Sequence, residues 1–155
     1  MASLLALPSE AAPVRNFKAR AGDCVACHKA AKVLPDEHVP TKDLELDDCE
    51  QCHAPRSDKA LTGRVPLDHL HGLKGVTCAQ CHGVGKRQAV PALEQCVSCH
   101  GSTAKLAEKT ANVKPENPHD SPHWGPNMEC TACHHVHEKS QSYCAYCHTF
   151  GFRVP

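Results

Sequence analysis

Cys24-Val-Ala-Cys-His28 is the stretch that decides the fold, because the chain repeats this pattern six times. Each copy is a Cys-x-x-Cys pair followed directly by a histidine. Together the pairs contain all twelve cysteines, namely Cys24, Cys27, Cys49, Cys52, Cys78, Cys81, Cys96, Cys99, Cys130, Cys133, Cys144 and Cys147. The histidines that follow them are His28, His53, His82, His100, His134 and His148. One kind of chemistry, used six times, must explain the repeat.

Twelve cysteines in a short chain serve disulfides, zinc sites or haem attachment. Histidine accounts for 13 of 155 residues, so six chance placements after six pairs have a probability on the order of 10⁻⁷. Zinc ribbons need no histidine after every pair, and disulfides have no use for one. Two thiols three residues apart lie on one side of a helical turn and reach one porphyrin, and the next histidine ligates its iron. The pattern predicts six covalently bound haem c groups.

The composition supports an interior filled by something other than side chains. Leucine, valine and phenylalanine make up 27 of 155 residues and isoleucine is absent, a share below the roughly 20% under which chains rarely build a core. Lys and Arg number 17, as do Asp and Glu, so the chain does not have the charge excess of a disordered protein. We expect haem to replace the core, the haem-free chain to be unfolded, and the haem propionates to make the holoprotein acidic.

The expected fold is mainly irregular, with short α-helices, little or no β-structure and a haem core. Segments rich in Pro, Gly, Lys and Asp separate the motifs and predict loops, whereas residues 103–110 are the best candidate for a helix that carries no motif. Residues 1–15 are expected to be a flexible N-terminal tail, and 16–155 a six-haem domain. No stretch approaches the ~20 apolar residues of a membrane span. Because haem c is attached outside the cytoplasm, we expect a periplasmic or extracellular protein.

Motif spacing suggests a weak internal repeat. The long gap from Cys49 to Cys78 is followed by a short one to Cys96, and the long gap from Cys96 to Cys130 is followed by a short one to Cys144. This spacing predicts that haems 3 and 4 form one close pair and that haems 5 and 6 form another.

The histidines outside the motifs are candidate distal ligands. Seven remain, namely His38, His69, His71, His119, His123, His135 and His137. Only Met1 and Met128 could offer thioethers instead. Seven histidines for six irons predict bis-histidine ligation throughout, with one histidine left over.

Four further stretches stand out toward the C-terminus, namely Gln95-Cys-Val-Ser-Cys-His-Gly101, Asn117-Pro-His-Asp-Ser-Pro-His-Trp124, His137-Glu-Lys-Ser140 and Tyr143-Cys-Ala-Tyr-Cys-His-Thr-Phe150. Through them the part of the chain from Cys96 to Pro155 resembles the tetrahaem domain of the flavocytochrome c fumarate reductases. The resemblance implies that His119, His123 and His137 are distal ligands, together with His71 before the third motif. In that family the chain runs on into a flavin domain after the stretch similar to 151–155, so the resemblance suggests a separate flavoprotein as the partner here.

Asn16-Phe-Lys-Ala19 and Asp68-His-Leu-His-Gly72 are similar to stretches of the free-standing small tetrahaem cytochromes c. Lys18 and Gly85 stand where that family has ligand histidines. We interpret the chain as a tetrahaem unit, about residues 65–155, with two haems added in front, for which His38 and His69 are the remaining donors. His135 is then expected to be a surface or propionate-binding residue.

The favoured function is electron transfer between redox proteins, without catalytic residues and without a nucleic-acid partner. A flavoprotein reductase and a quinol-oxidising membrane cytochrome are the candidate partners. Two alternatives stay open at this point. If Lys18 replaced a histidine weakly at haem 1, that iron could bind a small molecule and act as a reductase. If His38 or His135 ligated a haem of a second copy, the protein could form a haem-wire filament.

Overall fold

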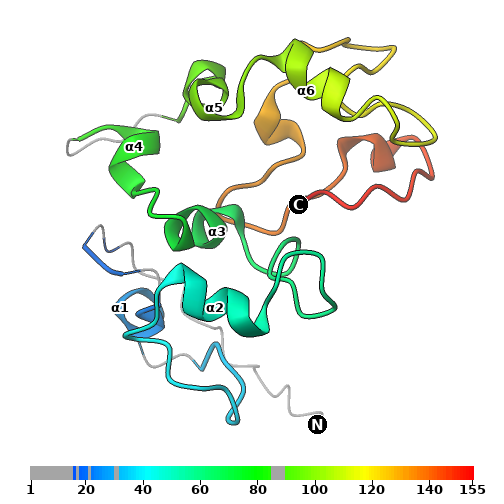
Figure 1. Ribbon diagram of the computed structural model, residues 1–155. Coiled ribbons are helices and arrows are strands. Elements are labelled where there is room, and N and C mark those ends of the chain that lie inside the picture. Colours follow the sequence, from blue (N-terminus) through cyan, green and yellow to red (C-terminus); the bar gives the residue numbers. More distant parts are fainter. Residues whose placement is uncertain (1–15, 17, 21, 30–31, 85–89) are drawn as a thin grey trace, which may run out of the picture.

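The computed structural model describes residues 16, 18–20, 22–29, 32–84 and 90–155 (Figure 1). Short helices are its main regular structure. They are α1 (Cys24–His28), α2 (Leu46–Cys52), α3 (Leu67–Leu73), α4 (Cys78–His82), α5 (Leu93–His100), α6 (Thr103–Lys109) and the 3-10 helices η1 (Cys130–Ala132) and η2 (Tyr143–Tyr146). Within the described ranges the only β-type pairing is an isolated bridge between Ser121 and Gly125. The expected fold class is confirmed, whereas the proposed tail, residues 1–15, lies outside the described residues.

Short helices carry the first four motifs, as expected, but the last two motifs lie on 3-10 turns. The backbone N–H of His134 nevertheless donates to the carbonyl of Cys130 at 2.8 Å, and that of His148 donates to Cys144 at 2.8 Å. These bonds span four residues, so the turn from the first cysteine to the histidine still closes with α-helical geometry. Each motif therefore presents its two thiols and its imidazole from one turn.

Helix α6 carries no motif and begins at its own cap. The Ser102 side chain accepts a hydrogen bond from the backbone N–H of Lys105, which satisfies one free N–H of the first turn. At the other end the Thr110 hydroxyl donates to the Leu106 carbonyl at 2.8 Å. The helix expected over residues 103–110 is thus confirmed, and it ends one residue earlier.

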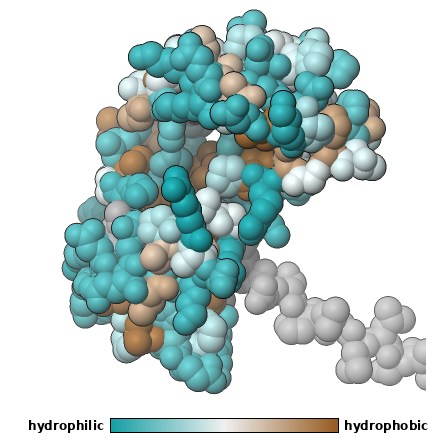
Figure 2. Space-filling model, turned by 45° about the vertical axis from the view of Figure 1, so that its right-hand side comes forward, coloured by the Kyte–Doolittle hydropathy of each residue, from teal (hydrophilic) through white to brown (hydrophobic). Residues whose placement is uncertain are grey.

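The polypeptide builds no hydrophobic core of its own. In the described part of the chain no hydrophobic side chain is buried, and Ser121 is the one buried polar residue. Val84 is 97% exposed and Val25 is 64% exposed. Figure 2 shows a largely hydrophilic face with hydrophobic residues in scattered groups and a hollow near its centre. Side-chain packing alone does not explain how the helices are held.

The helices are arranged in two groups that meet at α3. Helices α1 and α2 lie together near the N-terminal end, and α4, α5 and α6 follow one another in an arc that partly surrounds the C-terminal segment (Figure 1). The backbone N–H of Asp68, in the first turn of α3, donates to the carbonyl of Val136 at 2.9 Å. Helix α3 is therefore joined to a segment that is distant in the sequence and belongs to the fifth motif region.

Candidate metal centres

Capping interactions fix where two of the motif helices begin. At α4 the Thr77 side chain accepts from the backbone of the first turn, while its backbone N–H donates to Gln80 Oε1 at 2.6 Å. At α2 the same reciprocal arrangement joins Glu45 and Asp48. Such capping boxes satisfy two free N–H groups at once. The first cysteine of each of these motifs is therefore held at a defined place in its helical turn.

Every motif histidine faces one of the other histidines. The ring pairs and their centroid distances are His28–His69 (6.0 Å), His53–His38 (6.0 Å), His82–His137 (5.9 Å), His100–His71 (5.9 Å), His134–His119 (6.2 Å) and His148–His123 (6.1 Å). The six partners are the six histidines expected from the sequence to be distal ligands. Each is used once.

These distances fit a metal ion between the rings. Two imidazoles whose nitrogens each lie about 2 Å from one shared metal have ring centroids roughly 6 Å apart. The angles between ring planes range from 4° for His119–His134 to 76° for His71–His100. Such a spread would be compatible with two histidines binding one metal, because the angle between the two ring planes does not change the distance from each nitrogen to the metal. The residues present thus fit six irons that are each held by two histidines.

Hydrogen bonds at Nδ1 orient several of these rings. His53 Nδ1 lies 2.6 Å from the carbonyl of Lys59, and His38 Nδ1 lies 2.8 Å from that of Val39. A carbonyl only accepts, so both rings carry their proton on Nδ1 and leave Nε2 free for a metal. His38 and His53, which form the second pair, are therefore in the same tautomer, the one whose Nε2 can bind a metal.

The fifth pair is held by a small polar network around Thr110. The Thr110 hydroxyl lies 3.1 Å from His119 Nδ1 and 2.6 Å from Asn117 Oδ1. Burial lowers the pKa of His119. Burial also lowers the pKa of His134, with a smaller opposing effect from a hydrogen bond to the backbone of Pro155. Both rings are therefore biased toward the neutral form, which is the form that binds a metal.

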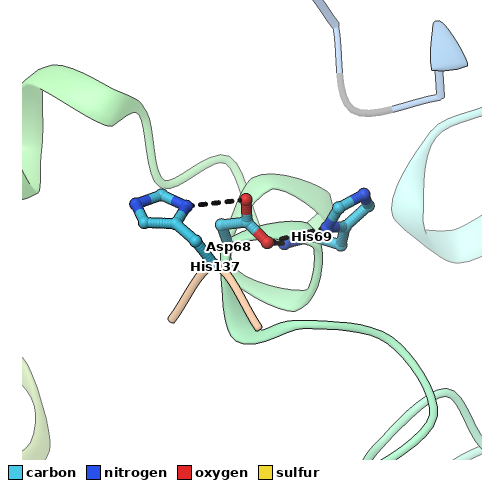
Figure 3. A network of polar contacts seen from close by, with 3 residues as sticks. All are labelled: Asp68, His69 and His137. Atoms are coloured by element: carbon cyan, nitrogen blue, oxygen red, sulfur yellow. Dashed lines mark hydrogen bonds and ion pairs between the residues drawn. The ribbon is translucent and has the colours of Figure 1, made fainter. Parts of the chain in front are cut away.

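Asp68 contacts distal candidates of two different pairs (Figure 3). Its Oδ1 lies 2.7 Å from His69 Nδ1, and its Oδ2 lies 3.0 Å from His137 Nδ1. Burial acts to raise the pKa of Asp68, but the hydrogen bonds from the two histidines outweigh it and the pKa is lowered overall. The carboxylate form is thus favoured where it accepts from both rings. Sequence reasoning missed this residue, although it directly precedes a candidate ligand.

Two residues left open by the sequence, His135 and Lys18, belong to none of the six ring pairs. His135 forms no ring contact with a motif histidine among the described contacts, and its Nδ1 is buried without a hydrogen-bond partner. A buried Nδ1 of this kind fits a site completed by an acceptor such as a haem propionate. Lys18 is exposed, and its backbone N–H donates to Asn16 Oδ1 at 3.1 Å.

Neighbouring motifs lie against one another through their cysteines. Burial raises the pKa of the Cys130 thiol, and the nearby Cys96 thiol raises it further. Burial and then Cys96 raise the pKa of Cys81. Gln95 Nε2 also donates to the carbonyl of Gln80 at 2.6 Å. The third, fourth and fifth motifs are therefore contiguous in space.

Two hollows border the motifs. One of about 250 Å³ is lined by Cys78 and Leu73, and one of about 170 Å³ is lined by Cys49, His53 and Leu70. The residues that the structure describes contain no group of three or more His, Cys, Asp or Glu side chains arranged to hold a metal.

Among the described residues, no helix of the protein is long and apolar enough to cross a membrane.

Comparison with known proteins gives one family and several relatives. The sequence profile of the cytochrome c3 family matches residues 70–149, which is about half of the chain. An acrylate reductase cytochrome subunit from Shewanella woodyi is 37% identical over 88 residues, covering 55% of this chain and 74% of that protein. A probable fumarate reductase, Ifc3, from Shewanella frigidimarina is 39% identical over 102 residues, covering 63% of this chain but only 16% of its own length. The cytochrome c-type protein Cgr1 from Eggerthella lenta is 29% identical over 112 residues, covering 66% of this chain and 47% of its own length.

Proposed function

This chain belongs to the cytochrome c3 family, whose members carry covalently bound haem c and transfer electrons, and from that premise we propose that it is a six-haem, bis-histidine electron carrier of the periplasm. The first two motifs precede the region matched by the family profile, residues 70–149. The count of six haems therefore rests on the motifs and on the six histidine pairs.

The observation that carries the proposal is the pairing of every motif histidine with one further histidine. An iron with two histidine ligands and four porphyrin nitrogens has no free position for a substrate. Its chemistry is then outer-sphere electron transfer, with potentials tuned by hydrogen bonds to the ligands, by burial and by neighbouring charge. A chain of such irons carries electrons and does not transform a bound molecule.

Contacts between motifs support electron transfer between neighbouring haems. Cys96 and Cys130 are close enough to interact electrostatically, which brings the fourth and fifth attachment sites together, and the hydrogen bond from Gln95 to Gln80 joins the third to the fourth. Asp68 connects a ligand candidate of haem 1 to one of haem 3. These contacts bring sites of haems 1, 3, 4 and 5 next to one another, which supports electron transfer among these four haems.

The test is the spin state of the oxidised holoprotein, measured by electron paramagnetic resonance, with carbon monoxide added to the reduced form. Bis-histidine ligation predicts that all six haems are low-spin and that no carbon monoxide binds. The measurement needs the haem content of the same sample as its control. A high-spin signal that integrates to one haem or more would contradict the carrier proposal for that haem.

For the partner, we propose a separate flavoprotein reductase that accepts electrons from this chain. The names of two relatives support this idea, since one is a cytochrome subunit of an acrylate reductase and the other a probable fumarate reductase. Interfaces between redox proteins lie at the small end of the size range and are transient. A surface without a large apolar patch, as on the face in Figure 2, suits such an encounter.

Stopped-flow mixing tests the partner. The protein, reduced under anaerobic conditions, is mixed with a flavoprotein reductase from the same organism in the presence and absence of that enzyme's substrate. We expect the haems to reoxidise only when flavoprotein and substrate are both present, and the rate to fall as salt is raised if charge steers the encounter. Reoxidation by the substrate without the flavoprotein would instead assign the reductase activity to this chain.

A further inference from the structure

The two oxygens of Asp68 are divided between ligand candidates of two haems. His69 faces His28 of the first motif, and His137 faces His82 of the third. One carboxylate, in the first turn of α3, therefore contacts a ligand candidate of the two N-terminal haems and one of the four C-terminal haems (Figure 3).

Hydrogen bonds hold both the backbone and the side chain of Asp68 in place. Its backbone N–H donates to the carbonyl of Val136, next to His137 in the chain, at 2.9 Å. Its Oδ1 accepts from the backbone N–H of His69 at 2.8 Å as well as from the ring. An acidic residue in the first turn of a helix is common for electrostatic reasons alone. Here, however, both oxygens are directed to imidazole nitrogens, which the helix dipole does not require.

A carboxylate that accepts from Nδ1–H has two effects on a metal-bound histidine. It fixes the tautomer and ring orientation, so that Nε2 faces the metal, and it makes the ligand more basic. A more basic ligand, with negative charge nearby, stabilises ferric over ferrous iron. The reduction potential of the haem therefore becomes more negative.

We propose that Asp68 is a positioning residue shared by haems 1 and 3, which orients one distal ligand of each and lowers both reduction potentials. The inference rests on the proposed bis-histidine function. It predicts a specific pattern, in which haems 1 and 3 respond together to a change at one side chain although their motifs are not adjacent in the sequence. It also makes Asp68 the polar link between the added two-haem part and the tetrahaem unit.

The experiment is a haem-resolved redox titration of the holoprotein carrying Asp68→Asn, followed by nuclear magnetic resonance of the haem methyl groups. The substitution keeps the size of the side chain but removes its charge and one of its two acceptor oxygens. We expect two of the six haems, numbers 1 and 3, to shift to more positive potential while the other four stay unchanged. Asp43→Asn is the matched control, because Asp43 is exposed and has no polar contact to a histidine among the described contacts; it should shift none.

The outcomes separate this inference from the proposal on which it rests. If the unaltered protein has six low-spin haems but Asp68→Asn moves no potential, or moves all six alike, Asp68 has no such role and the carrier proposal stands. If the unaltered protein has a high-spin haem 1 or 3, the bis-histidine assignment itself fails.

A second pair of variants keeps the inference testable should Asp68→Asn lose haem during purification. Asp68→Glu retains the charge, and Asp68→Ser removes it with a smaller side chain. We expect the potentials of haems 1 and 3 to stay near those of the unaltered protein in Asp68→Glu and to rise in Asp68→Ser. Any other order of these two reduction potentials among the unaltered protein, Asp68→Glu and Asp68→Ser overturns the inference.

Discussion

A chain produced without haem attachment is expected to have no stable tertiary structure. The physical reason is that burial of apolar surface is the main force for folding, and no hydrophobic side chain of the described residues is buried by the polypeptide. Histidines from distant segments meet in six pairs. When haem bridges such a pair, its binding free energy becomes folding free energy. The haem-free chain should therefore show no cooperative thermal transition by circular dichroism, whereas the holoprotein should show one.

The matched comparison for this experiment is a chain in which all twelve cysteines are replaced by alanine, expressed beside the unaltered chain under conditions that support haem attachment. Both chains are produced under the same conditions and differ only in the twelve substitutions and in the covalent haem that these remove. Strong protection of backbone amides from hydrogen exchange in the alanine chain would contradict the prediction. Such a result would mean that the polypeptide is held in its fold by contacts other than those to haem.

Local features could be predicted from the sequence because neighbouring residues determine them. The Cys-x-x-Cys-His spacing places thiols and imidazole on one turn whatever surrounds it, and the structure has such a turn at every motif. Helix α6 was also predictable, since Ser102 caps it and its residues favour helix. The 3-10 form of the last two motifs could not be predicted, because it depends on how each turn ends and not on the residues of the motif.

Long-range features could be predicted only in part. Counting histidines left seven candidates for six irons, and the family resemblance reduced them to six. The structure brings the same six next to motif histidines, but the pairing joins residues far apart in the chain. His28 meets His69 and His82 meets His137, and no periodicity or spacing encodes such partners. Asp68 was missed for the same reason. Its contact with His137 depends on the approach of two segments that the sequence does not relate.

The pairing of His28 with His69 allows a direct test of how the iron of haem 1 is ligated. His69→Ala is expected to leave one haem high-spin in the oxidised protein and to create one carbon monoxide site per chain in the reduced protein. The reason is that the ring of His69 lies 6.0 Å from that of His28, at the separation expected across an iron, and alanine offers no ligand. Electron paramagnetic resonance and the optical change on addition of carbon monoxide measure the two effects on one sample.

The controls for His69→Ala are Lys18→Ala and His135→Ala, which also distinguish the carrier from a reductase with one weakly ligated haem. The resemblance to the small tetrahaem cytochromes c puts Lys18 at a ligand position, yet Lys18 is exposed, whereas His69 faces the first motif. Both control variants should therefore keep six low-spin haems. If Lys18→Ala produced the high-spin haem and His69→Ala did not, lysine would be the ligand of haem 1. If that lysine left the iron readily, the iron would become a site for small molecules and the chain a candidate enzyme.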